Sequence, residues 1–137
     1  MIIIVDTCAV IAIFDRRHPS NMQLKELLLT EDNLYIIPST VVTESCYILN
    51  TRFGVKFEIS FINEIIETNF IFEPVQFEDL TRIIELLEKY KDLNLGYCDS
   101  AIIAISERFG TNKILTLDKK HFNVVIPKGF DYFDILI

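Results

Sequence analysis

The chain has 137 residues, of which 50% are hydrophobic and 24% are charged, and its formal net charge is −7. These values predict a single folded domain over 1–137 and exclude a disordered chain. The acidic balance also argues against a protein that coats nucleic acid through bulk positive charge.

No membrane segment and no signal peptide are expected. No apolar run approaches the length of a membrane span. The first residues, MIIIVDTC, lack a basic segment and reach an acid at position 6, which is unlike a signal peptide. We therefore expect a cytoplasmic protein.

In the first half of the chain, short apolar runs alternate with helical patterns. Pro19 suits the first position of a helix, Ser39 suits an N-cap, and Gly54 suits a helix end. The expected elements are strands at 2–5 and 34–37, and helices at 7–14, 19–30, 39–54 and 55–69.

The second half continues the alternation and contains the clearest amphipathic helix, at 77–91. Its expected inner face is Leu80, Ile83, Ile84, Leu87 and Tyr90. The other expected elements are a helix at 96–110 and strands at 70–74, 113–116 and 123–127.

The predicted strands are continuously apolar, a pattern typical of parallel strands that are covered on both faces. Strands that alternate with helices predict a three-layer α/β/α fold, with right-handed crossovers and a central, mainly parallel sheet of about five strands. In such a sheet, ligands bind beyond the carboxyl ends of the strands.

Four acids are expected to meet at that edge of the sheet. Two follow strands, and two lie in the first turns of helices, close to the same edge. They are Asp6, Glu44, Asp99 and Asp118. A carboxylate among apolar neighbours is costly unless it is satisfied, and a divalent cation would satisfy several at once.

Each acid also has an ordinary structural explanation, which the residues alone leave open. Asp6 could cap the following helix, and Asp99 could stabilise a helix N-terminus. Asp118 could form a turn, and Glu44 could be a solvated helix residue.

The cysteines show no paired spacing of the kind that zinc sites use. Cys8 and Cys46 each follow an acid by two residues, a rotation of about 200° around a helix. We therefore expect Cys8, Cys46 and Cys98 to be buried thiols, and Cys8 and Cys46 to face away from the acids. Oxygen ligands without thiols favour Mg²⁺ or Mn²⁺.

Four segments of the chain resemble a known family. The segments IIIVDTCAVIAIF, STVVTESCYIL, YKDLNLGYCDSAIIAISERFG and KILTLDKKHF look like successive blocks of the PIN domain. They are most similar to the VapC-like ribonuclease toxins of toxin–antitoxin pairs. The resemblance spans nearly the whole chain, and its last two blocks are the most specific.

The resemblance implies a fold, an activity and a set of site residues. Asp6, Glu44, Asp99 and Asp118 match the four family acids, and Thr7 and Thr116 match hydroxyl positions beside them. The family implies Mg²⁺ or Mn²⁺, an RNA substrate, a homodimer and a small antitoxin protein. Asp92 also matches a common acid, and its role stays open.

With a metal held by the acids, no side chain is needed as a general base. His18 and His121 are expected at the surface. Basic residues near the expected mouth are candidates for phosphate contacts, with an ordinary charged surface as the alternative. They are Arg16, Arg17, Lys119 and Lys120.

Three other functions fit the sequence less well. A phospho-receiver domain needs an acceptor Asp after its third strand, where this chain has Glu73. A haloacid-dehalogenase-type phosphatase needs a second Asp two residues after the first, where this chain has Cys8. A PIN-like scaffold without catalysis would not need all four acids.

Overall fold

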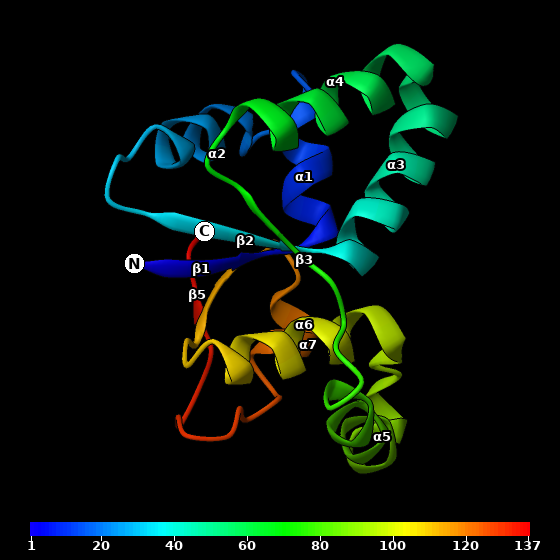
Figure 1. The fold of residues 1–137 in the computed structure, drawn as a ribbon, viewed down its shortest axis with the longest axis vertical. Helices are drawn as coiled ribbons and strands as arrows, with labels where there is room; N and C mark the ends of the chain where they lie inside the picture. Colours follow the sequence, from blue (N-terminus) through cyan, green and yellow to red (C-terminus); the bar gives the residue numbers. More distant parts are fainter.

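The computed structural model describes residues 1–137 and contains a five-stranded parallel sheet in the order β3-β2-β1-β4-β5 (Figure 1). The strands are β1 (Ile2–Val5), β2 (Leu34–Pro38), β3 (Ile71–Glu73), β4 (Lys113–Leu115) and β5 (Asp134–Ile135). The predicted parallel sheet is therefore confirmed.

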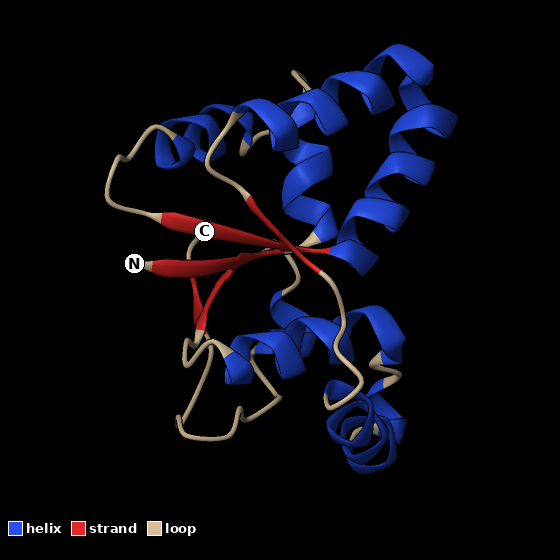
Figure 2. Ribbon diagram, in the orientation of Figure 1, coloured by secondary structure: helices blue, strands red, loops and turns tan.

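Helices cover both faces of this sheet, which confirms the three-layer prediction (Figure 2). One face carries α1 (Thr7–Phe14), α2 (Asn21–Leu28), α3 (Ser39–Phe53) and α4 (Val55–Glu67). The other carries α5 (Asp79–Lys89), a short 3-10 helix (Lys91–Leu93), α6 (Gly96–Arg108) and α7 (Lys119–Phe122).

The core lies where the central strands meet α1 and α6. Ile3 and Ile4 of β1 and Ile102 and Ile105 of α6 are fully buried. These large apolar side chains fix β1 and β4 side by side at the centre of the sheet. The positions of the residues that follow these two strands are thereby fixed as well.

The prediction of a strand at 123–127 is wrong. The segment follows α7 as an irregular turn in which Val125 is buried while Val124 and Ile126 are 53% and 55% exposed. The continuous apolar run Val124–Ile126 imitates a strand in the sequence, but no strand pairs with it. The fifth strand is β5, which pairs with β4 and is joined to it by an ion pair of 2.7 Å between Lys113 Nζ and Asp134 Oδ2.

Some predicted helix details also differ. Ser39 is the first residue of α3 rather than its cap, because Pro38 holds the extended backbone before the helix. Gly54 does end α3, with a φ of 104° that favours glycine. On α5 the inner face is rotated from the prediction. Ile83 is buried against Ala101 and Ala104 of α6, whereas Ile84 is 57% exposed, because α5 packs mainly on α6.

None of the helices combines the length and the hydropathy needed to cross a bilayer.

Two buried helix serines lead to opposite predictions for stability. Ser45 and Ser106 are both fully buried, but Ser106 Oγ donates to Ile103 O at 2.7 Å, whereas Ser45 Oγ has no hydrogen-bond partner. Because an unsatisfied buried hydroxyl costs about 1–3 kcal/mol, Ser45→Ala should raise the free energy of unfolding.

Ser106→Ala is the matched control, since it removes a hydroxyl of the same burial that is satisfied. Denaturant unfolding of both variants should place Ser45→Ala above Ser106→Ala by about 1 kcal/mol or more. The reverse order would show that Ser45 Oγ has a partner in solution.

Candidate functional site

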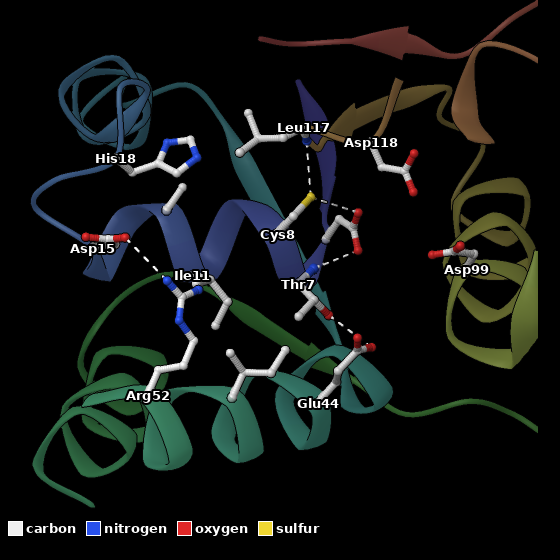
Figure 3. Close-up of a pocket in the computed structure, with 13 residues that line it drawn as sticks. Thr7, Cys8, Ile11, Asp15, His18, Glu44, Arg52, Asp99, Leu117 and Asp118 are labelled. Atoms are coloured by element: carbon white, nitrogen blue, oxygen red, sulfur yellow. Dashed lines mark hydrogen bonds and ion pairs between the residues drawn. The ribbon is translucent and has the colours of Figure 1, made fainter. Parts of the chain in front are cut away.

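The four predicted acids meet in one pocket at the carboxyl edge of the sheet (Figure 3). Asp6 directly follows β1, and Asp118 lies three residues after β4. Glu44 comes from α3, after β2, and Asp99 comes from the first turn of α6. The pocket that they line has a volume of about 460 Å³.

Asp6 is the most deeply buried of the four acids, at 5% exposure. Its carboxylate accepts hydrogen bonds from Thr7 N at 2.7 Å, from Thr116 Oγ1 at 2.6 Å and from Cys8 Sγ at 3.2 Å. Burial raises the pKa of Asp6 despite these bonds. All three donors are neutral, so no positive charge within the chain contacts this carboxylate.

The two predicted hydroxyl residues both contact acids of the pocket. Thr116 Oγ1 donates to Asp6 and accepts from Asp118 N at 2.9 Å, so one buried side chain links the two acids. Thr7 Oγ1 donates to Glu44 Oε2 at 3.4 Å. These contacts place Thr7 and Thr116 beside the acids, as the resemblance implied.

The pKa of Asp99 depends on the charges of the other residues in the cluster. Burial, together with the negative charges of Asp6, Asp118 and Glu44, raises the pKa of Asp99 to about 7, while His121 opposes the shift. The acids are therefore close enough to disfavour one another's ionisation.

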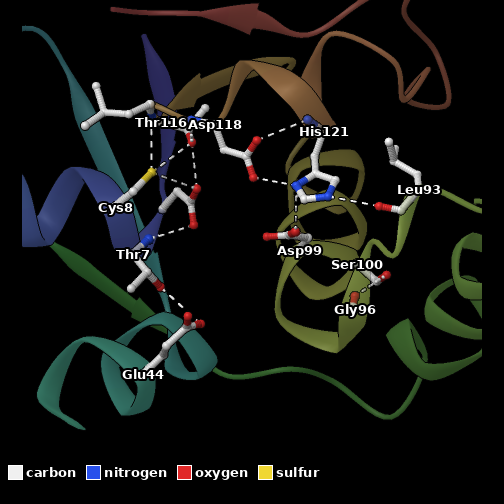
Figure 4. A network of polar contacts seen from close by, with 12 residues as sticks. Thr7, Cys8, Glu44, Leu93, Gly96, Asp99, Ser100, Thr116, Asp118 and His121 are labelled. Atoms are coloured by element: carbon white, nitrogen blue, oxygen red, sulfur yellow. Dashed lines mark hydrogen bonds and ion pairs between the residues drawn. The ribbon is translucent and has the colours of Figure 1, made fainter. Parts of the chain in front are cut away.

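His121 belongs to the site, contrary to the expectation of a surface position (Figure 4). Its Nδ1 contacts Asp118 Oδ2 at 2.5 Å and lies 3.6 Å from Asp99 Oδ2. Its Nε2 lies 3.1 Å from Leu93 O, a carbonyl that can only accept. The hydrogen bond with Asp118 raises the pKa of His121, which favours the positively charged form of the ring.

The sequence contained a local signal for this arrangement. Asp118 is the N-cap of α7, and its Oδ1 accepts from His121 N at 3.1 Å. An acid three residues before a histidine is a helix-start spacing that brings the two side chains together. The short helix that produces it was not predicted.

Cys8 also belongs to the site, so the expectation that it faces away from the acids is wrong. Asp6 lies before the helix with φ −98° and ψ 160°, so a rotation counted along a helix does not apply to this pair. Cys8 Sγ contacts Asp6 Oδ2 and Thr116 Oγ1, and it accepts from Leu117 N, each at 3.2 Å. Burial, followed by the charge of Asp6, raises the pKa of this thiol to about 12.

The other two thiols differ from each other. Burial raises the pKa of Cys98 to about 12, with a further contribution from the neighbouring Glu44, so this thiol is also close to the acids. Cys46 does not line the pocket, and the charge that acts on it is that of Glu58. Glu44 and Cys46 lie within one helix, where the 200° rotation does apply.

The four predicted basic contacts lie outside the pocket. Lys119 and Lys120 are exposed on α7, and Arg16 and Arg17 line an adjoining hollow at the end of α1 that shares Asp15 and Arg52 with the pocket. Two residues that the sequence analysis did not select, Arg52 and His18, line the pocket at the end away from Asp99 (Figure 3). Asp92 is exposed in the short 3-10 helix and does not line the pocket.

The fold and the pocket define a parallel α/β protein with a carboxylate cluster at the carboxyl edge of its sheet. The family model described as the PIN domain matches residues 3–126. The chain therefore belongs to the PIN domain family.

Similar proteins carry related names. The chain is 28% identical over 133 residues to a Mycobacterium tuberculosis protein named ribonuclease VapC26, covering 97% of this chain and 98% of that protein. The fold matches the crystal structure of M. tuberculosis VapC20, described as a sarcin-ricin loop cleaving toxin, with a TM-score of 0.78 and 18% identity. That match covers 85% of this chain and 90% of VapC20.

A second structural match is VapBC2 from Rickettsia felis bound to a DNA fragment from their promoter. Its TM-score is 0.69 at 18% identity, over 89% of this chain and 91% of that one. FitAcB from Neisseria gonorrhoeae matches with a TM-score of 0.65 at 13% identity, over 86% and 88% of the two chains.

The raised pKa of Asp99 predicts that the metal-free fold loses stability as the pH rises. The folded chain binds a proton at Asp99 up to about pH 7, whereas an unperturbed Asp releases it near 3.8. The contribution of Asp99 to stability is therefore fully present below pH 4 and is lost as the pH rises towards 7.

Asp99→Asn should shrink the difference between metal-free melting temperatures at about pH 5 and pH 8, and at pH 8 it should melt several degrees above the wild type. Asp92→Asn is the control, because Asp92 is exposed outside the pocket. An Asp99→Asn protein with the pH dependence of the wild type would contradict the shifted pKa.

The Cys8 thiol links Asp6, which follows β1, to Leu117 N, which follows β4. We expect these hydrogen bonds to contribute more to the free energy of unfolding than the volume of the side chain does. Cys8→Ala removes the donor to Asp6 and the acceptor of Leu117 N, at an expected cost of about 1–2 kcal/mol of unfolding free energy. Cys8→Ser should recover part of that loss. If denaturant unfolding shows alanine to be as stable as serine, the thiol acts by packing alone.

Proposed function

We propose that this chain is a metal-dependent endoribonuclease and the toxin of a toxin–antitoxin pair, with one nuclease domain over 1–137. Membership of the PIN domain family and the relative named ribonuclease VapC26 support cleavage of RNA. The observation that carries the proposal is the pocket of four carboxylates, in which the buried Asp6 is contacted by neutral donors only.

The donor set of the pocket fits a hard divalent cation. The side chains offer carboxylate oxygens, and ligand oxygens of Asp99 and Asp118 lie within 4.8 Å of each other. Carboxylate oxygens are the ligands that hard cations prefer, and the nearby Cys8 Sγ is already engaged by Asp6, Thr116 and Leu117 N. Asp6, Glu44, Asp99 and Asp118 would hold Mg²⁺ or Mn²⁺.

When bound, the ion would supply an activated water and stabilise charge on the phosphoryl oxygens. The chain's own residues supply the geometry. Thr116 and Cys8 fix the orientation of the Asp6 carboxylate, and Thr116 also fixes the backbone at Asp118. His121 holds Asp118 from the opposite side and contributes positive charge next to Asp99.

The proposal includes partners and a location. The similarity in fold to VapBC2 and FitAcB supports a small antitoxin protein as a partner. A homodimer and a cytoplasmic location belong to the same proposal. Arg16, Arg17, Lys119 and Lys120 lie outside the pocket, so any contact that they make would be to more distant parts of the RNA.

The central test is the loss of RNA cleavage when acids of the pocket are neutralised. Asp6→Asn or Asp99→Asn should lower the rate of cleavage of cellular RNA with Mn²⁺ by orders of magnitude, because each removes a charged oxygen ligand. Sequencing of new RNA ends, together with circular dichroism of each variant, would measure the loss and check the fold.

Asp92→Asn is again the matched control and should cleave like the wild type. Cleavage by Asp6→Asn at the wild-type rate would refute the site assignment. A folded wild type that cuts no RNA with either metal would favour the alternative of a PIN scaffold that only binds a partner.

A further inference from the structure

The pocket extends well beyond the carboxylates. It continues between α1 and α3 as a groove that ends at Asp15, His18 and Arg52 (Figure 3). On α3 the lining residues Glu44, Ile48 and Arg52 are spaced by four, so they form one stripe along the helix. The groove is therefore a continuous surface with the acids at one end and an arginine at the other.

Arg52 is the one arginine or lysine among the residues that line this pocket. Its side chain is 52% exposed, and Nη2 lies 3.7 Å from Asp15 Oδ2, too far for a hydrogen bond. Asp15 Oδ1 instead accepts from Arg17 N at 3.0 Å. The N–H groups of the Arg52 guanidinium therefore make no hydrogen bond to Asp15 and are free to donate to a ligand.

The length of the groove determines what Arg52 can contact. Arg52 lies eight residues after Glu44 on one helix, a rise of about 12 Å. Neighbouring phosphates on one strand are closer together than this, because each nucleotide of a duplex strand advances by only about 3.4 Å along the helix axis. An RNA whose scissile phosphate lies at the acids would thus present a different phosphate to Arg52.

The wall between the two ends is apolar. Ile11 and Ala12 of α1 face Ile48 of α3 across the groove, and none of them competes for a phosphate. At the far end, His18 Nδ1 accepts from Ser20 N at 3.1 Å, so in the neutral ring the proton is on Nε2, as a further donor. The groove combines an apolar wall, suited to a ribose or base, with cationic and neutral donors beyond it.

We propose that Arg52 binds a non-scissile phosphate of the RNA strand, in exchange for its loose ion pair with Asp15. This inference rests on the proposed ribonuclease function and adds to it the direction in which the strand leaves the acids, along α1 and α3. It also identifies a positive contact inside the pocket of an acidic chain whose other predicted basic contacts lie outside that pocket.

The test compares three charge changes on one mixed-sequence, single-stranded RNA pool cleaved with Mn²⁺. Arg52→Gln should raise KM by about five- to tenfold with kcat nearly unchanged, as expected for a lost charge-assisted contact. The slope of log(kcat/KM) against log[salt] should flatten by about 0.7, the value for one phosphate contact on a single strand.

Asp15→Asn should act in the opposite direction, lowering KM, because it removes the anion that competes for Arg52. Lys56→Gln is the matched control: it removes one positive charge from an exposed position on α4 outside the pocket. Its KM and salt slope should match those of the wild type. Melting temperatures of all variants check that each is folded.

The outcomes separate this inference from the proposed function. If the wild type cleaves the pool and Arg52→Gln behaves like Lys56→Gln, Arg52 has no phosphate contact and the inference is overturned alone. If Arg52→Gln and Asp15→Asn both melt lower with unchanged KM, the pair is structural and the inference is again overturned. If the folded wild type neither binds nor cleaves RNA, the proposed function is overturned as well.

Discussion

The mutual repulsion of four carboxylates at one edge of the sheet is the constraint that organises the site. Carboxylates that share a pocket disfavour one another's ionisation, and at Asp99 burial together with the charges of the other three acids raises the pKa to about 7. The chain does not relieve the repulsion by placing arginine or lysine among the acids. It fixes Asp6 with neutral donors and places a single histidine between Asp99 and Asp118.

Hydrogen bonds from buried and half-buried side chains tie Asp6 and the backbone of Asp118 to the sheet. Thr116 joins Asp6 to the backbone of Asp118, and Cys8 joins Asp6 to the backbone of Leu117. Both links connect the end of β1 with the end of β4, which pair in the centre of the sheet. The geometry of the acids is thus fixed by strand pairing, and the proposed divalent cation would supply positive charge beyond that of His121.

The sequence predicted the fold well because its strongest signals are long and apolar. Four strands and the main helices follow from such runs, and the acids at their ends followed from the rule for parallel sheets. The fifth strand was misplaced because the apolar run around Val125 imitates a strand, whereas β5 has only two residues. A strand as short as β5 carries too little sequence pattern to be recognised.

The residues missed at the site share a different cause. Cys8 was misjudged because Asp6 lies outside the helix, so helical geometry could not relate the two. His121 reaches the acids only because α7, a helix of four residues, turns the chain back. Arg52 lines the pocket through the packing of α3 against α1, a tertiary contact that no local spacing encodes.

The most direct test of a metal site at these acids is anomalous diffraction from a crystal of the protein grown with Mn²⁺. The carboxylate cluster predicts an anomalous peak in the pocket at coordination distance, roughly 2.0–2.6 Å by analogy with other hard cations, from oxygens of Asp6 and of Asp99 or Asp118. A fully formed pocket without any peak there at saturating Mn²⁺, with His121 still bridging Asp99 and Asp118, would contradict it.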